Sequence, residues 1–128
     1  MTRGQSLAAV VLTHLAVSVV HGRAHDGADV PLSLAASLFV YIVILAGPLA
    51  GLALWPWRPR SGAWLVAASM TGALLFGLIN HFIIPGSDHV ANVAAQWRTL
   101  FGVTAALLVV CEAAGAGVAV WATTGRRS

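Results

Sequence analysis

The chain has 128 residues, of which 59% are hydrophobic and only 9% charged, and its formal net charge is +3. Soluble domains carry about a quarter charged residues, so this composition excludes an ordinary soluble domain and indicates a chain surrounded mostly by lipid. The basic residues are all arginines at the ends of apolar segments, which suits a topology-setting role and argues against nucleic-acid binding. We therefore expect an all-α integral membrane protein, a single antiparallel bundle of four transmembrane helices over residues 1–128.

The first apolar segment predicts a membrane span over about residues 6–24. A cleavable signal peptide is the alternative, because Arg3 precedes a short apolar run. Against cleavage, His14 interrupts the run and no clean small-x-small site follows it. We favour an uncleaved first helix.

The second span is predicted over about residues 31–55, with Pro31 in the first helical turn. Pro48 lies inside this span and predicts a kink, because proline lacks an N–H and clashes with the preceding turn. The spacing Gly47-x-x-x-Gly51 is typical of surfaces where two helices approach closely.

The third and fourth spans are predicted over about residues 63–84 and 97–122. A break rich in proline, arginine and tryptophan, residues 55–62, precedes the third span, and Pro85-Gly86 follows it. Apolar residues at helical spacing also predict a short helix over about residues 88–96. That helix would lie along the membrane interface or form an early turn of the fourth span.

Arginine bias predicts the orientation of the bundle. With four spans, both termini and the central loop share one side, which holds five of the seven arginines: Arg3, Arg58, Arg60, Arg126 and Arg127. Arg23 and Arg98 remain for the other side. Because cytoplasmic loops carry the excess of positive charge, we expect both termini in the cytoplasm of a multi-pass protein in a bacterial inner membrane.

Histidines and carboxylates gather toward the outer side of this predicted bundle. His21 and His25 are one turn apart on the first helix, and His81 lies near the outer end of the third. The candidate ligands for a metal or haem are therefore His21, His25, His81, His89, Asp26 and Asp88. Imidazole and carboxylate ligands suit zinc, copper or non-haem iron, whereas a b-type haem would take the depth-matched pair His21 and His81 as axial ligands.

A second polar pair is expected deeper in the membrane. His14 lies about 10 Å below His21 at about 1.5 Å per residue, and Glu112 lies at a similar depth in the fourth span. An ionised glutamate in hydrocarbon needs a partner, and His14 is the expected one. This pair either relays protons or fixes the packing of two helices.

No complete motif of a known catalytic class is present, so we expect no enzymatic activity from this chain alone. The function we predict is binding of a metal ion or haem b through the outer histidines, for metal handling or electron transfer within a larger assembly. A protein partner or a second copy is expected, besides membrane lipid. The alternatives are a small proton- or ion-conducting subunit that uses His14 and Glu112, and a purely structural subunit whose small residues at 113–117 pack against a partner helix.

Overall fold

A computed structural model, which describes residues 1–124, is all-helical and contains four helices long and apolar enough to cross a membrane. The first is α1 (Arg3–Gly27) and the last is α5 (Ala95–Thr123). The second consists of α2 (Leu34–Phe39), η1 (Val40–Ala46) and α3 (Gly47–Leu54). The third consists of α4 (Pro59–Leu78) and η2 (Ile79–Ile83).

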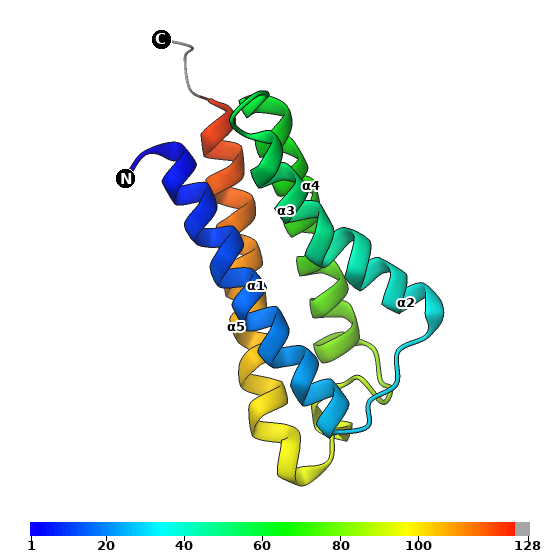
Figure 1. Cartoon of the computed structure of the whole chain (residues 1–128). Helices are drawn as coiled ribbons and strands as arrows, with labels where there is room; N and C mark the ends of the chain where they lie inside the picture. Colours follow the sequence, from blue (N-terminus) through cyan, green and yellow to red (C-terminus); the bar gives the residue numbers. More distant parts are fainter. Residues whose placement is uncertain (125–128) are drawn as a thin grey trace.

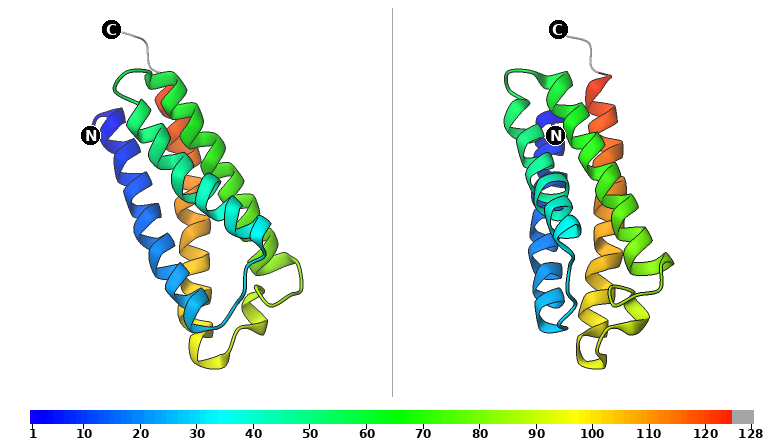
Figure 2. Two further views of the ribbon diagram at one scale, coloured as in Figure 1. Left: turned by 45° about the vertical axis from the view of Figure 1, so that its right-hand side comes forward. Right: turned by 90° about the vertical axis from the view of Figure 1, so that its right-hand side faces the viewer.

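The four helices form an elongated bundle in which α1 runs beside α5, α3 runs beside α4, and α4 also packs on α5 (Figures 1 and 2). The first and last described helical turns lie at the same end, which we call the terminal end. The opposite end, with the connections 28–33 and 84–94, is called the histidine end. The large exposed side chains along the bundle are mostly aliphatic or aromatic, which suits contact with lipid.

Local capping explains where α1 and α2 begin. Thr2 and Gln5 form a capping box, each side chain satisfying the backbone N–H of the other, so α1 starts at Arg3 rather than near residue 6. The second span begins at Leu34, because the Ser33 hydroxyl accepts from the N–H of Ala36. The prediction that Pro31 opens this helix is therefore wrong, and Pro31 lies in the connection.

The break expected at Pro48 takes the form of a π-helical stretch. η1 precedes Gly47, whose N–H bonds the carbonyl of Ile42 five residues earlier. The wider helical register leaves room for the proline ring and accommodates its missing N–H. On the same segment, Gly51 faces Gly62 of α4 so closely that an added Cβ would lie 2.7 Å from the Gly62 carbonyl. The glycine spacing thus packs the helices of one chain together.

The third span is longer at its start than expected. Pro59 is the first residue of α4, a position where a missing N–H costs nothing. η2 ends at Ile83, because Ile84 adopts the extended conformation that Pro85 imposes on the residue before it.

The helix predicted over residues 88–96 is largely wrong. Only the single turn η3 (Val90–Asn92) forms there, and α5 starts at Ala95. Val93 is extended and buried against Ala24 and Phe101, and its carbonyl accepts two bonds from the Arg98 guanidinium. Burying Val93 in the core stabilises this fold-back in place of a helix lying flat on the interface.

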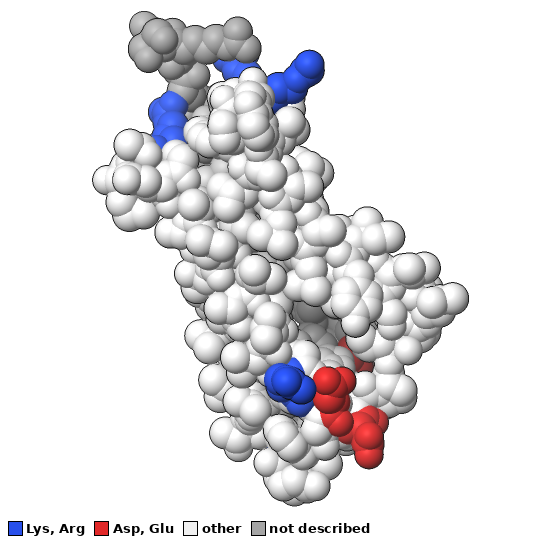
Figure 3. Space-filling model, viewed as in Figure 1, with Lys and Arg blue, Asp and Glu red and all other residues white. Residues whose placement is uncertain are grey.

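Charge is distributed unevenly over the surface (Figure 3). The terminal end carries Arg3, Arg58 and Arg60, while the three aspartates lie at the histidine end together with Arg23 and Arg98. Arg126 and Arg127, on which the predicted orientation also depends, lie outside the described residues. The interior at the terminal end is apolar and consists of Leu7, Val11, Val66, Ala67, Met70 and Ala119.

Candidate metal centre

Three histidines from two helices meet inside the histidine end of the bundle. His21 and His25 lie one turn apart on α1, and His81 comes from η2. One ring nitrogen of each lies within 4.8 Å of the corresponding nitrogens of the other two. His21 and His81 are buried, and the His25 side chain is 12% exposed. These three residues are hereafter called the histidine cluster.

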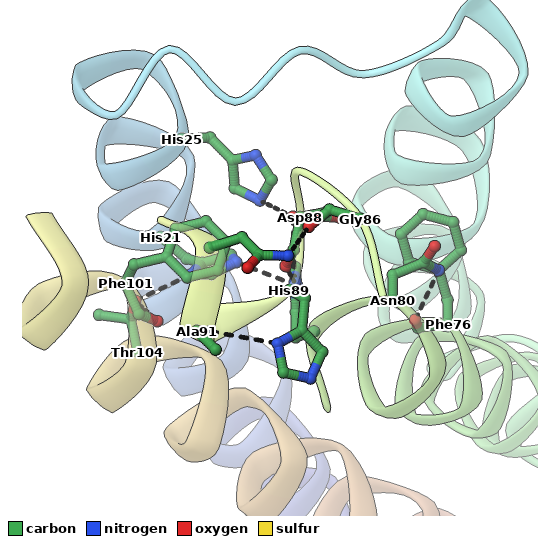
Figure 4. A network of polar contacts seen from close by, with 12 residues as sticks. His21, His25, Phe76, Asn80, Gly86, Asp88, His89, Ala91, Phe101 and Thr104 are labelled. Carbon is green, nitrogen blue, oxygen red and sulfur yellow. Dashed lines mark hydrogen bonds and ion pairs between the residues drawn. The ribbon is translucent and has the colours of Figure 1, made fainter. Parts of the chain in front are cut away.

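Thr104 of α5 determines which nitrogen of His21 carries the proton (Figure 4). The Thr104 hydroxyl has a single hydrogen, which it donates to the Leu100 carbonyl at 2.7 Å or to the Phe101 carbonyl at 3.1 Å. Its oxygen lies 2.8 Å from His21 Nδ1, and with that hydrogen on a carbonyl it accepts the Nδ1–H of His21. In the neutral ring, the other nitrogen of His21, Nε2, then has a free lone pair.

Asp88 determines the corresponding state of His81. His81 Nδ1 lies 3.1 Å from the backbone carbonyl of Asp88 and 3.1 Å from its carboxylate oxygen Oδ1. Both oxygens can only accept, so Nδ1 is the protonated nitrogen and Nε2 of the neutral ring has the lone pair. This carbonyl and carboxylate also hold the plane of the ring in place.

The two free nitrogens of His21 and His81 face each other. Their Nε2 atoms lie 3.2 Å apart in the buried interior. Two lone pairs at that distance repel unless a cation lies between them, either a proton or a metal ion. With both Nδ1 atoms protonated, the arrangement is therefore suited to a positively charged species at this point.

His25 offers a third nitrogen of the same kind. Its Nε2 lies 3.3 Å from Asp88 Oδ1, an ion-pair distance that favours the hydrogen on Nε2. Its Nδ1 is buried and has no hydrogen-bond partner within residues 1–124. Each histidine of the cluster thus has one nitrogen within 3.3 Å of an oxygen and one nitrogen left for a ligand.

The negative charge of the Asp88 carboxyl suits a site that holds a cation. Burial alone would raise the pKa of the Asp88 carboxyl, but contact with His81, with smaller effects from His25 and His21, outweighs burial and lowers that pKa below its usual value. The carboxyl is therefore ionised at neutral pH. A partly buried carboxylate next to three imidazoles would balance part of the charge of a cation held there.

Phe101 completes the walls of the centre. Its ring centroid lies 4.8 Å from the rings of His21 and His25 and 5.2 Å from that of His81. Phe101 and Thr104 are three residues apart on α5 and therefore share a face toward the cluster. Neither was predicted as a site residue, because an isolated phenylalanine or threonine in an apolar span carries no sequence signal for a ligand.

Of the three predicted ligands outside the cluster, Asp88 contacts it and two others do not. The His89 ring accepts from the N–H of Ala91 through Nδ1 and donates to the Phe82 carbonyl through Nε2, so it stabilises the connection before η3 (Figure 4). The exposed Asp26 follows His25 directly but makes no contact that joins it to the three rings among the described residues. Sequence adjacency alone placed both residues with the ligands.

The deeper pair is in contact. His14 Nε2 lies 3.3 Å from Glu112 Oε1, and the two residues are 1% and 2% exposed. Ser18, one turn along α1, lies 3.5 Å from the same histidine nitrogen. The other carboxylate oxygen, Glu112 Oε2, has no hydrogen-bond partner within residues 1–124.

A cavity of about 350 Å³ connects these two polar centres. The histidine cluster and Asp88 line one part of it, and Glu112 lines another. Apolar side chains from all four spans form most of the remaining wall, among them Val19, Val40, Ile44, Phe76 and Leu108. The cavity is large enough for a small molecule as well as for water.

Comparison with protein-family models, with curated proteins and with solved structures finds no match to this chain. The site is therefore interpreted from its own geometry.

Proposed function

We propose that this chain is a membrane protein that binds a divalent transition-metal ion, zinc in the first instance, through the histidine cluster. The ligand atoms are His21 Nε2, His81 Nε2 and His25 Nδ1. The observation that carries the proposal is the 3.2 Å approach of two buried imidazole nitrogens whose hydrogen-bond partners leave both with lone pairs. A metal ion between the two nitrogens would accept both lone pairs and so remove their repulsion.

The third free nitrogen and the outer partners support an ion rather than a shared proton. In a tetrahedral site with metal–nitrogen bonds of 2.0–2.1 Å, neighbouring ligands lie about 3.3 Å apart, close to the 3.2 Å separation of the two nitrogens. A shared proton would need only His21 and His81, yet His25 offers a third lone pair. Orientation of every ligating ring by an oxygen partner is also the usual pattern around bound metals.

The same distance weighs against haem b, the other cofactor considered. Two imidazoles that bind one iron from opposite sides need about 4 Å between their nitrogens, with a porphyrin plane between them. His21 and His81 are closer than that, and their rings meet edge to face at an interplanar angle of 74°. Phe101 packs on the rings where the porphyrin would need room.

We further propose that the bundle spans a bacterial inner membrane with both termini in the cytoplasm and the histidine cluster near the outer face. The excess of arginine near both termini and in the central loop, five against Arg23 and Arg98 at the other end, supports this orientation. A buried centre with so little protein outside the spans suits metal handling, or electron transfer if the ion is copper, together with a protein partner or a second copy.

Proton conduction through His14 and Glu112 receives less support. A path across the membrane would have to continue from Glu112 to the terminal end. The interior there is the apolar group around Leu7, Val66 and Met70, and no buried ionisable side chain of residues 1–124 lies among them. The polar interior therefore opens toward one end only.

The test is metal binding by the purified full chain in detergent, measured by elemental analysis and by competition with a zinc chelator. We expect one zinc ion per chain, no haem absorption, and at least a hundredfold loss of affinity in His21→Ala, His25→Ala and His81→Ala. His89→Ala and Asp26→Asn are the matched controls, because these side chains lie outside the cluster, and they should keep wild-type affinity. Equal affinity in all five variants would refute the site.

A further inference from the structure

The cavity beside the histidine cluster is closed at its inner end. Toward the terminal end its walls stop at Glu112, Ala73 and Leu45, and the apolar core lies beyond them. At the histidine end it is lined by Arg23 of α1, by Leu32 of the connection 28–33 and by Tyr41 of η1. The divergence of α2 from α1 is visible in Figure 1, and Figure 3 shows a hollow with acidic side chains beside it. A cavity closed at one end suits a bound molecule better than a conduit.

Glu112 presents an unused acceptor at the closed end of the cavity. Its Oε1 contacts His14, but its Oε2 is buried without a hydrogen-bond partner within residues 1–124. The residue is only 2% exposed, so bulk water does not solvate this oxygen. A buried carboxylate oxygen left unpaired costs free energy, so a donor inside the cavity is expected to satisfy it.

Gly77 keeps the space between Glu112 and the histidine cluster open. A Cβ added at Gly77 would lie 3.8 Å from Glu112 Oε2 and 3.9 Å from His81 Cδ2. These two atoms are therefore less than about 8 Å apart, on either side of a residue without a side chain. One small molecule can reach from the cluster to the carboxylate.

The histidine cluster leaves a coordination position for such a molecule. Asp88 contacts the protonated nitrogens of His25 and His81, so it orients the ligands instead of binding the ion itself. Three protein ligands are typical of metal sites that keep a fourth position for water or substrate. Because all three histidines line the cavity, that position opens into it.

We propose that the cavity binds a small neutral molecule that carries two groups: a lone pair that occupies the fourth position on the metal, and an N–H or O–H that donates to Glu112 Oε2. The apolar walls favour an uncharged molecule that enters from the lipid between α1 and α2. This inference rests on the proposed metal centre and assigns to Glu112 the recognition of its ligand.

The test uses two probes that differ in one hydrogen-bond donor. Imidazole and N-methylimidazole both bind metals through one nitrogen, but only imidazole has an N–H to donate. The full chain is loaded with Co²⁺ in place of zinc, and each probe is titrated while the visible cobalt absorption is recorded. We expect the protein to bind imidazole about tenfold more tightly than N-methylimidazole, the size of effect that a hydrogen bond to a buried charge gives.

Two variants test whether the preference for imidazole arises at Glu112 inside the cavity. Glu112→Leu should bind Co²⁺ normally and lose the preference for imidazole. Gly77→Leu should weaken both probes at least tenfold, because its side chain fills the space between Glu112 and His81. Gly102→Leu is the matched control, since nothing lies within 4 Å of a Cβ at that helical position.

The outcomes separate this inference from the metal centre. A chain that binds Co²⁺ but shows no spectral change with either probe, or an imidazole preference that survives in Glu112→Leu, overturns the ligand pocket alone. A chain that binds no Co²⁺ refutes the metal centre and this inference with it.

Discussion

At the level of single residues, the direction of one hydrogen bond determines what His21 can bind. The Thr104 hydroxyl donates its only hydrogen to a backbone carbonyl, so toward His21 it acts only as an acceptor. His21 Nε2 is thereby kept free of hydrogen in the neutral ring. Asp88 does the same for His81 with a carbonyl and a carboxylate. In the proposed metal centre, these partners orient the histidine rings and fix their ring hydrogens without binding the ion themselves.

Thr104→Val tests whether the Thr104 hydroxyl orients His21 for metal binding. Valine keeps the shape of threonine but cannot accept the Nδ1–H of His21, so the ring loses its fixed orientation and proton position. We expect zinc affinity to fall about 10- to 100-fold, as is usual when the outer partner of a metal ligand is removed. Chelator competition measures the change. Thr123→Val is the control, because the Thr123 hydroxyl is exposed and bonds only the Val120 carbonyl.

The sequence predicted part of the site. Helical spacing places His21 and His25 together, and counting depth along two spans pairs His21 with His81. Such reasoning could not predict the contacts of Thr104 and Asp88. Which ring nitrogen each of them contacts depends on rotations of helices that no periodicity specifies. His89 was grouped with the ligands because it follows Asp88, yet the backbone turn between them points its ring toward Phe82 and Ala91.

At the level of helices, glycine and proline position the site. The contact of Gly51 with Gly62 brings α3 and α4 backbone to backbone. Farther along, η1 and η2 change the helical register of the second and third spans, and His81 lies within η2. Apolar composition was enough to predict that four helices exist. It could not predict the π-helical stretches, because these depend on how Pro48 and His81 are accommodated by neighbouring helices.

Gly62→Ala should loosen the α3–α4 pair. An added Cβ would lie 2.6 Å from the Gly51 carbonyl and 2.9 Å from the backbone N of Trp55, so the helices must separate. We expect a loss of about 1–3 kcal/mol in stability, seen as a lower unfolding temperature in detergent. Gly117→Ala meets nothing within 4 Å and should leave stability unchanged or slightly higher. Equal unfolding temperatures for the two variants would contradict the close packing.

At the level of the whole molecule, the two ends of the bundle differ in charge and interior. The terminal end combines arginines outside with an apolar core inside, whereas the histidine end combines aspartates with a polar interior. A metal ion at the histidine end would join α1 to the third span, which otherwise meet there only through side chains. Overall stability should therefore depend on the ion.

Zinc should stabilise the folded bundle by mass action. A ligand that binds only the folded state at a hundred times its dissociation constant adds about 2.7 kcal/mol, so zinc should raise the unfolding temperature by several degrees and a chelator should reverse the rise. Magnesium, which prefers oxygen ligands, should have no such effect. His81→Ala should unfold at the same temperature with and without zinc. A zinc-induced rise that persists in His81→Ala would place the ion elsewhere.

The proposed orientation can be tested by reporter fusions at the C-terminus. A fluorescent protein that folds only in the cytoplasm should be bright there, and a phosphatase that is active only outside should be inactive. Fusions within the connection 28–33 should give the opposite pattern. The same result at both positions would rule out the predicted topology.

The ligands of the histidine cluster are far apart in the order of synthesis. His21 and His25 emerge with the first span, whereas His81 and Asp88 follow only after the second span and the central loop. A nascent chain with two spans therefore has an incomplete site, and stable loading must wait until the third span has been inserted. In the proposed metal centre, occupancy by the ion would then distinguish chains with the third span in place from chains that lack it.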